Sequence, residues 1–170
     1  MIRRLWLAGL GAVVFAVALP SARARAPHRP GRVLVANDAA SCTVRAIRAL
    51  AHKGGIDKRL RFLRRQLSRA PFSAFRSFKL LSAKKLAIPH GASRKTTLPG
   101  GRLLKLTFKD KLLLKRKVRL RMHLRVHKTA RAKKLLQNTL YTVVNGRTFL
   151  NVYAAEKGKA LVVGITCSAK

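Results

Sequence analysis

The stretch KVRLRMHLRVH at residues 117–127 alternates apolar and polar side chains from its first residue to its last. The apolar positions share one parity: Val118, Leu120, Met122, Leu124 and Val126. The polar positions share the other: Lys117, Arg119, Arg121, His123, Arg125 and His127. Successive side chains of a strand point to opposite faces of a sheet, so this pattern predicts a β-strand with one buried face and one cationic face.

Shorter apolar runs on both sides of this stretch predict further strands, with a break at Ser82-Ala83. The runs lie at 32–36, 75–81, 84–88, 96–98, 102–109, 139–144, 147–153 and 160–167. Asn145-Gly146 is the strongest short hairpin signal, because both residues tolerate the positive φ of a type I′ turn. Asp110-Lys111 and residues 156–159 predict two more turns. Residues 160–167 are apolar on both faces, which predicts a central strand.

A helical period occurs before residue 70. It places three leucines at i, i+3 and i+7: Leu60, Leu63 and Leu67. This spacing predicts a helix over 58–68, with Asp57 as its N-cap and Pro71 beyond its end. Residues 43–52 predict a second, short helix before Gly54-Gly55. The expected fold class is α+β, in which one or two short N-terminal helices precede a mostly antiparallel β meander that forms a small barrel or sandwich.

Residues 1–24 have the three parts of a secretory signal peptide. Arg3 and Arg4 form a positive n-region, residues 5–19 form an uncharged h-region, and Ala22-Arg23-Ala24 fits the small-x-small cleavage pattern. As a helix the h-region would span about 22 Å, less than the roughly 30 Å of a hydrocarbon core; an uncleaved anchor is the alternative. We expect cleavage near Ala24 and a periplasmic or secreted protein. Residues 25–31 would then form a flexible leader and residues 32–170 a single β-rich domain.

The chain has two cysteines, Cys42 and Cys167. In an exported protein an even number of cysteines favours a disulfide. Closing so long a loop would stabilise the fold by about 4–5 kcal/mol in the chain-entropy model. Two buried free thiols are the alternative.

The chain is strongly basic, with 39 Lys and Arg against 4 Asp and Glu and a formal net charge of +35. The candidate anion-binding residues lie on the polar face of 117–127, in the loop that follows it and on the polar face of the 58–68 helix. They are Lys117, Arg119, Arg121, Arg125, Lys128, Arg131, Lys133, Lys134, Arg61, Arg64 and Arg65. Such a surface attracts polyanions.

Outside the cytoplasm the expected partners are lipopolysaccharide, anionic lipid surfaces and acidic polymers of the envelope. One alternative is an accessory or scaffold subunit of an envelope complex, with an acidic protein partner. Another is a basic surface with no dedicated ligand. Nucleic acid would bind only nonspecifically, because the chain shows no helix-turn-helix, zinc-finger, KH or RNP pattern. The oligomeric state stays open.

The composition argues against an enzyme. Four carboxylates leave little for acidic metal cages or paired-carboxylate catalysis, and no GxSxG or Cys-His family signature is present. His123 and His127 would lie about 13 Å apart on one face of a strand, too far apart to share one ion. We therefore expect no catalytic residues, no metal and no cofactor.

Several segments resemble, in order, a group of small exported bacterial proteins of uncharacterised function. After the export signal they are PFSAFRSFKLLS (71–82), TLPGGRLLKLTF (97–108), VRLRMHLRV (118–126), LLQNTLYTVVNGRTFLNV (135–152) and GKALVVGITCSA (158–169). The shared pattern is a short helix, an aromatic-rich segment and a β meander that ends in a strand like GxLVxxIT. This chain departs from the pattern in being far more basic and in carrying Cys42 and Cys167. The resemblance implies a fold and a compartment, and no activity or binding residue carries over.

Overall fold

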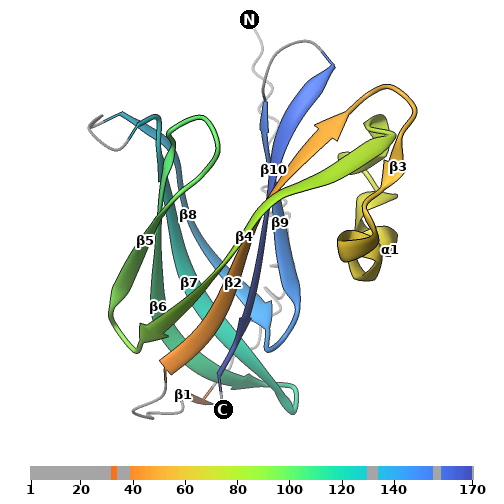
Figure 1. Ribbon diagram of the computed structural model, residues 1–170. Helices are drawn as coiled ribbons and strands as arrows, with labels where there is room; N and C mark the ends of the chain where they lie inside the picture. Colours follow the sequence, from red (N-terminus) through yellow and green to blue (C-terminus); the bar gives the residue numbers. More distant parts are fainter. Residues whose placement is uncertain (1–31, 34–38, 130–133, 155–157, 170) are drawn as a thin grey trace, which may run out of the picture. The chain divides into compact units, whose positions relative to one another are not determined.

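A computed structural model describes residues 32–33, 39–129, 134–154 and 158–169 of the chain. Residues 31–170 form one compact unit. In the described residues this unit contains two five-stranded sheets and a short helical segment (Figure 1). The signal peptide and leader expected at 1–31, and Arg131 and Lys133 of the predicted basic loop, lie outside the described residues.

The first sheet has the order β1-β6-β7-β8, and β5 also pairs with β6. Its strands are β1 (Arg32–Val33), β5 (Ser93–Thr97), β6 (Leu103–Leu114), β7 (Lys117–His127) and β8 (Leu135–Val144). All of its pairings are antiparallel. Strand β7 has the predicted bounds, and four of its apolar side chains are fully buried: Leu120, Met122, Leu124 and Val126. The prediction from the alternating stretch is confirmed.

The second sheet has the order β3-β4-β2-β10-β9. Its strands are β2 (Ala39–Leu50), β3 (Gly55–Ile56), β4 (Ser77–Pro89), β9 (Thr148–Ala154) and β10 (Lys159–Ser168). Strand β10 pairs with β2 on one side and with β9 on the other, so the prediction of a central last strand is confirmed. Its pairings are antiparallel, except that the short β3 runs parallel to β4.

The two sheets face each other across one hydrophobic core. Its buried residues come from β6 and β7 of the first sheet and from β2 and β10 of the second, among them Leu106, Phe108, Val44 and Val163. The described strands show no backbone pairing between β8 and β9, so a closed barrel is not formed. A mostly antiparallel, β-rich α+β fold is confirmed.

The helical segment covers one end of the outer face of the second sheet. It comprises the 3-10 helix η1 (Lys58–Leu63), the short α-helix α1 (Arg64–Leu67) and the 3-10 turn η2 (Phe72–Ala74). Leu60, Leu63 and Leu67 are buried in a second core, against Ile47 of β2 and Val162 of β10. The predicted helix is confirmed in position and in its buried face, although most of it is the tighter 3-10 form.

The predicted helix over 43–52 is wrong, because these residues belong mainly to strand β2. The sheets' common core buries Val44 on the inner face, whereas Ile47 faces outward into the core under the helical segment. The buried face of β2 therefore changes from inner to outer between Ala46 and Ile47, and Arg48 is exposed, which interrupts the alternation. Apolar residues three apart, such as Val44 and Ile47, then imitate a helical period.

The sequence predicts interruptions at two places where the structure has continuous strands with a shift in register. The predicted turn at Asp110-Lys111 is wrong: β6 continues to Leu114, with a register shift between Phe108 and Asp110. The chain turns instead at Lys115 and Arg116, which both have positive φ (51° and 60°). The expected break at Ser82-Ala83 is also wrong, since β4 is continuous there and only its register against β2 shifts, between Ala46 and Ile47.

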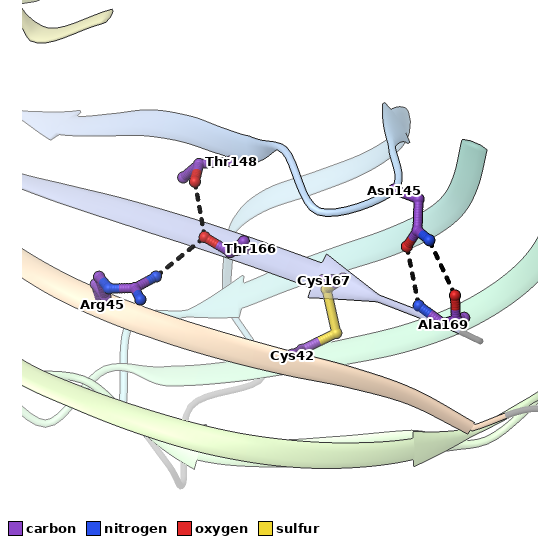
Figure 2. Close-up of a disulfide and its surroundings, with 7 residues drawn as sticks. All are labelled: Cys42, Arg45, Asn145, Thr148, Thr166, Cys167 and Ala169. Atoms are coloured by element: carbon purple, nitrogen blue, oxygen red, sulfur yellow. Dashed lines mark hydrogen bonds between the residues drawn. A yellow bond between two sulfur atoms is a disulfide. The ribbon is translucent and has the colours of Figure 1, made fainter. Parts of the chain in front are cut away.

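Asn145-Gly146 forms a turn but not a hairpin. The Arg147 backbone N–H donates to the Val144 carbonyl (2.9 Å), and Gly146 takes a φ of +77°. The strands on either side belong to different sheets, since β8 pairs with β7 and β9 with β10. The Asn145 side chain bonds the backbone N–H and C=O of Ala169, at 2.9 Å each (Figure 2). The turn thus carries the chain between sheets and ties down the end of the chain.

Cys42 and Cys167 form a disulfide, as the even cysteine count predicts (Figure 2). The two residues stand directly opposite each other in the pairing of β2 with β10. Both side chains are buried in the core between the sheets. The bond therefore joins two neighbouring central strands from opposite ends of the folded domain's sequence.

Candidate anion-binding surfaces

The outer face of the first sheet gathers cations from three neighbouring strands. Lys95 of β5 stands opposite Lys105 of β6, and Lys105 stands opposite Arg125 of β7. Side chains opposite each other in a sheet have Cβ atoms about 4.5–5.5 Å apart, and like charges in such positions destabilise the sheet. We call Lys95, Lys105 and Arg125 the cationic row. The residue that follows Arg125 in this row is Asn138 of β8, which carries no charge.

Hydroxyl and imidazole groups lie beside the cationic row. The Oγ atoms of Ser93 and Thr107 are 2.8 Å apart, and Thr107 stands opposite His123. The His123 ring donates from Nε2 to Oδ1 of Asn138 at 2.6 Å. Hydroxyl and imidazole groups are therefore placed next to the three cations, where they can add hydrogen bonds to a bound oxyanion.

Two arginines of β7 have a buried nitrogen that lacks an acceptor. The Nε atoms of Arg119 and Arg125 are buried and make no hydrogen bond within the described residues. Buried polar atoms in folded proteins nearly always have a hydrogen-bond partner. The terminal nitrogens of these guanidinium groups are not among the buried atoms without a partner, and guanidinium groups bind carboxylate and phosphate through two parallel N–H donors.

Carboxylates neutralise few of the described cations. Asp110 lies on the same outer face, with Oδ2 3.7 Å from a terminal nitrogen of Arg121 and Oδ1 3.9 Å from Nε2 of His90. Arg121 is therefore less available to an external anion than Arg125. Asp57, the other carboxylate of the described residues, pairs with Arg59 at 2.8 Å.

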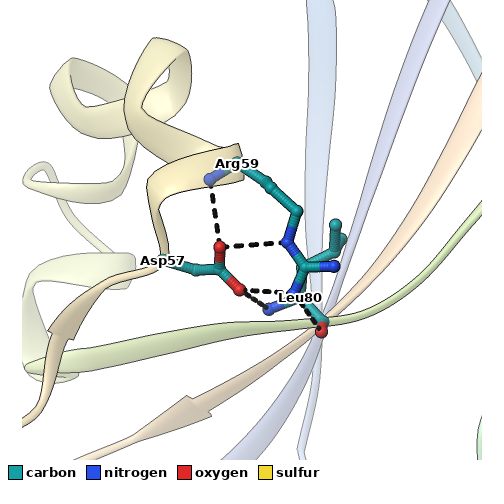
Figure 3. Close-up of polar contacts among 3 residues, drawn as sticks. All are labelled: Asp57, Arg59 and Leu80. Carbon is teal, nitrogen blue, oxygen red and sulfur yellow. Dashed lines mark hydrogen bonds and ion pairs between the residues drawn. The ribbon is translucent and has the colours of Figure 1, made fainter.

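Asp57 has a structural role at the start of the helical segment (Figure 3). Its Oδ1 accepts from the backbone N–H of Arg59 at 3.0 Å, and its Oδ2 accepts from the Leu80 N–H at 3.2 Å. The Arg59 guanidinium also donates to both oxygens. The side-chain and backbone hydrogen bonds from Arg59 hold the pKa of Asp57 well below its usual range. The carboxylate thus joins η1 to β4 and serves as the predicted N-cap.

The other predicted anion-binding residues do not form one cluster. Lys117 is exposed at the start of β7, and Lys128 and Lys134 are exposed at the two ends of the loop that follows it. The Lys128 N–H donates to the Lys134 carbonyl at 3.2 Å, which holds those ends together. In the helical segment that covers the second sheet, Arg61 and Arg64 line a pocket of about 850 Å³. Arg65 is exposed but is not among the residues that line that pocket.

The fold places three further cations, not predicted from the sequence, beside the candidate residues. Lys95 and Lys105 complete the cationic row, and Arg76 lines the pocket with Arg61 and Arg64. Lys105 alternates with the buried Leu104 and Leu106, a signal that could have placed it on an outer face. Lys95 and Arg76 carry no such signal, because their neighbours depend on strand register.

One arginine near the helical segment has a structural role. Arg45 of β2 donates to Oγ1 of Thr166 at 3.0 Å, and that hydroxyl lies 2.7 Å from Oγ1 of Thr148 (Figure 2). Its guanidinium carbon also lies 4.9 Å from the ring centre of Phe62 in η1. Burial lowers the pKa of Arg45. This side chain therefore joins β2, β10 and η1.

Polar side chains connect β8 and β9 where their backbones do not pair. The Tyr153 hydroxyl and the Asn151 amide both donate to Oε1 of Gln137, and the Gln137 amide donates to Thr139 at 2.9 Å. Burial raises the pKa of Tyr153 to about 12. The ring of Tyr141 stacks on Phe149 of β9, with centroids 4.0 Å apart. These side-chain contacts join β8 to β9, which share no backbone hydrogen-bond ladder among the described residues.

The described residues contain no group of three His, Cys, Asp or Glu side chains that could hold a metal ion. No helix among them is long and apolar enough to cross a membrane. No family model, curated protein or solved structure matches the chain. The resemblance to small exported bacterial proteins stays a prediction.

Proposed function

We propose that this protein is an exported, non-catalytic domain that associates electrostatically with anionic material of the cell envelope. The observation that carries the proposal is the cationic row on the outer face of the first sheet. Lys95, Lys105 and Arg125 stand opposite one another with no carboxylate of the described residues between them. A bound phosphate or carboxylate would relieve their repulsion and accept hydrogen bonds from the terminal guanidinium nitrogens of Arg125.

The proposed partners share one chemistry, a surface of repeated phosphate or carboxylate groups. Lipopolysaccharide, anionic lipid headgroups and acidic wall polymers all present it. Successive residues on one face of β7 lie about 6.6–6.8 Å apart, so several cations can contact neighbouring anionic groups at once. Release of condensed counterions would then contribute to binding, as it does on nucleic acid.

Export is part of this proposal and rests on two observations. The signal-like residues 1–24 precede the domain, and Cys42 and Cys167 form a disulfide. Disulfides persist mainly in oxidising compartments outside the cytoplasm.

The test uses vesicles of phosphatidylcholine with and without phosphatidylglycerol, titrated with the purified protein at increasing salt concentration. We expect binding to the anionic vesicles alone, and weaker binding as salt screens the charges. The row variant Lys95→Gln/Lys105→Gln/Arg125→Gln should bind about tenfold more weakly, because each substitution removes a cation that can form a charge-assisted hydrogen bond.

The matched control, called the helical-segment control, is Lys53→Gln/Lys58→Gln/Arg69→Gln, which removes the same charge from exposed positions in and just before the helical segment. Its affinity should stay within about threefold of the parent, because long-range charge effects on a screened surface are modest. Vesicle binding that does not change with salt would contradict the electrostatic mechanism. Equal losses in the two triple variants would contradict the assignment to the first sheet.

A further inference from the structure

The pocket beside the helical segment is lined by three arginines that have no carboxylate partner among the described residues. It measures about 850 Å³, and Arg61 of η1, Arg64 of α1 and Arg76 just before β4 contribute to its wall. Asp57 is bound by Arg59, and Asp110 lies on the other sheet beside Arg121. No carboxylate of the described residues therefore pairs with the three arginines of the pocket. We call Arg61, Arg64 and Arg76 the arginine triad.

Three arginines that line one pocket suit an anion with several terminal oxygens. A phosphate monoester has three such oxygens, one for each member of the arginine triad, whereas a carboxylate has two. Arginine binds both anions with paired N–H donors and keeps its charge at all physiological pH values. The triad therefore favours a phosphate monoester over a carboxylate.

The rest of the pocket wall includes an apolar side. The pocket is also lined by the half-buried Phe75 and by Leu67 and Phe78, which belong to the core under the helical segment. The neutral polar side chains of the lining are Ser73 and Ser68, and the Ser68 hydroxyl already donates to the Arg64 carbonyl at 2.9 Å. Hydrocarbon next to the phosphate would bury apolar surface against Phe75.

The size of the pocket limits what it can enclose. Pockets for small ligands commonly measure about 300–1,000 Å³. A volume of about 850 Å³ accommodates a glycerol phosphate headgroup and the first methylene groups of its chains. Longer acyl chains would extend past the pocket, into a bilayer or a micelle.

We infer that the arginine triad binds the phosphate monoester headgroup of a lipid, with the adjoining hydrocarbon against Phe75. This site goes beyond the proposed surface association. It is a discrete pocket that one ligand saturates, and it lies on the outer side of the second sheet, away from the cationic row. The two proposals can therefore fail separately.

Calorimetric titration with a monomeric short-chain lipid tests the inference without a membrane surface. The probe is dihexanoyl phosphatidic acid below its micelle concentration, compared with dihexanoyl phosphatidylcholine and with inorganic phosphate. We expect one saturable site for phosphatidic acid, no binding of phosphatidylcholine, and inorganic phosphate weaker by about tenfold because it buries no hydrocarbon. Inorganic phosphate that binds as tightly as phosphatidic acid would overturn the lipid assignment.

Variants then locate the site. Arg61→Gln/Arg64→Gln/Arg76→Gln should bind phosphatidic acid about tenfold more weakly, since it removes the charge-assisted bonds. Phe75→Ala should weaken the binding of phosphatidic acid and leave the binding of inorganic phosphate unchanged. Thermal unfolding of each variant confirms that it is folded.

Two controls separate this site from general charge and from the surface proposal. The helical-segment control Lys53→Gln/Lys58→Gln/Arg69→Gln and the row variant Lys95→Gln/Lys105→Gln/Arg125→Gln should both keep parental affinity for monomeric phosphatidic acid. A loss as large in the helical-segment control as in the triad variant would overturn the pocket. Vesicle binding that still depends on the cationic row would then leave the surface proposal standing.

Discussion

Two tyrosines at the junction of β8 and β9 show how much a single hydroxyl group depends on its surroundings. Tyr141 and Tyr153 are equally buried, each with 9% of its surface exposed. The Tyr153 hydroxyl donates to Gln137, whereas the buried Tyr141 hydroxyl has no hydrogen-bond partner among the described residues. The same atom thus stabilises the fold at one position and adds an unmet desolvation cost at the other.

Replacing each tyrosine by phenylalanine tests this difference. Tyr153→Phe should lower the free energy of unfolding by about 1–2 kcal/mol, because Gln137 loses a donor in a buried setting. Tyr141→Phe should be neutral or slightly stabilising, because it removes a buried hydroxyl that has no partner. Urea unfolding of the two variants measures both values. The reverse order of stability would contradict the hydrogen-bond assignment.

The same tyrosines predict a loss of stability in alkali. Burial raises the pKa of Tyr153 to about 12 and also raises the pKa of Tyr141, against about 10 in an unfolded chain. At pH values between the unfolded-state and folded-state pKa, tyrosines of the unfolded chain release protons that the folded chain keeps. The free energy of unfolding therefore falls as pH rises above about 10. Melting temperatures across this range should fall less steeply for Tyr141→Phe/Tyr153→Phe, which retains every lysine. Parallel curves would contradict the prediction.

At the scale of elements, β2 and β10 are joined twice, by their ladder and by the disulfide. Cys42 and Cys167 are 125 residues apart in sequence and directly opposite in register. The bond restricts the unfolded chain over nearly the whole domain. The disulfide therefore holds the centre of the second sheet together, although β8 and β9 do not pair within the described residues and the barrel is not closed.

Removing the disulfide should be costly. The chain-entropy model gives a loss of about 5 kcal/mol for Cys42→Ala/Cys167→Ala, because the unfolded chain regains the freedom of a long loop. Urea unfolding with and without reductant measures the loss. Reductant should destabilise the parent protein and leave the double variant unchanged; equal stability of the two proteins without reductant would contradict the prediction.

Repulsion within the cationic row should also lower the stability of the first sheet. Lys105 stands between Lys95 and Arg125, so Lys105→Glu replaces two repulsions with two attractions. We expect stabilisation by about 0.5–1 kcal/mol at low salt, and less at high salt. Lys53→Glu, at an exposed position outside the strands, changes the net charge equally and serves as the control. An equal gain in both variants would show an effect of net charge alone.

At the scale of the whole domain, the two candidate surfaces lie over different sheets. The cationic row is on the outer face of the first sheet, and the arginine triad is beside the segment that covers the second. The sheets' shared core lies between them. A single molecule could therefore contact two anionic surfaces at once, which strengthens attachment when both sites are engaged.

Clustering of vesicles tests this arrangement. Dynamic light scattering should show that the parent protein clusters vesicles containing phosphatidic acid, because one molecule bridges two of them. The row variant and the triad variant should each bind without clustering, while the helical-segment control should cluster like the parent. Clustering that persists in both single-surface variants would contradict bridging through these two surfaces.

The pattern of residues along the chain determined the strands and their faces wherever one face met the core and the other met water. Strand β7 is the clearest case, and the leucines of the helical segment are another. Strand β2 escaped this reasoning because its buried face changes from the inner side at Val44 to the outer side at Ile47. A change of buried face within one strand interrupts the period of two, and apolar residues three apart then imitate a helix.

Alternation by itself determined that Arg125 faces outward, and the even cysteine count favoured the disulfide. Only the tertiary structure decided that Lys95 and Lys105 stand beside Arg125, that Arg76 joins Arg61 and Arg64, and that Asn145-Gly146 crosses between sheets. The physical reason is that side-chain alternation depends on a residue's own strand. A residue's neighbours depend instead on register and on which strands pair, and these are set by contacts between segments far apart in the chain.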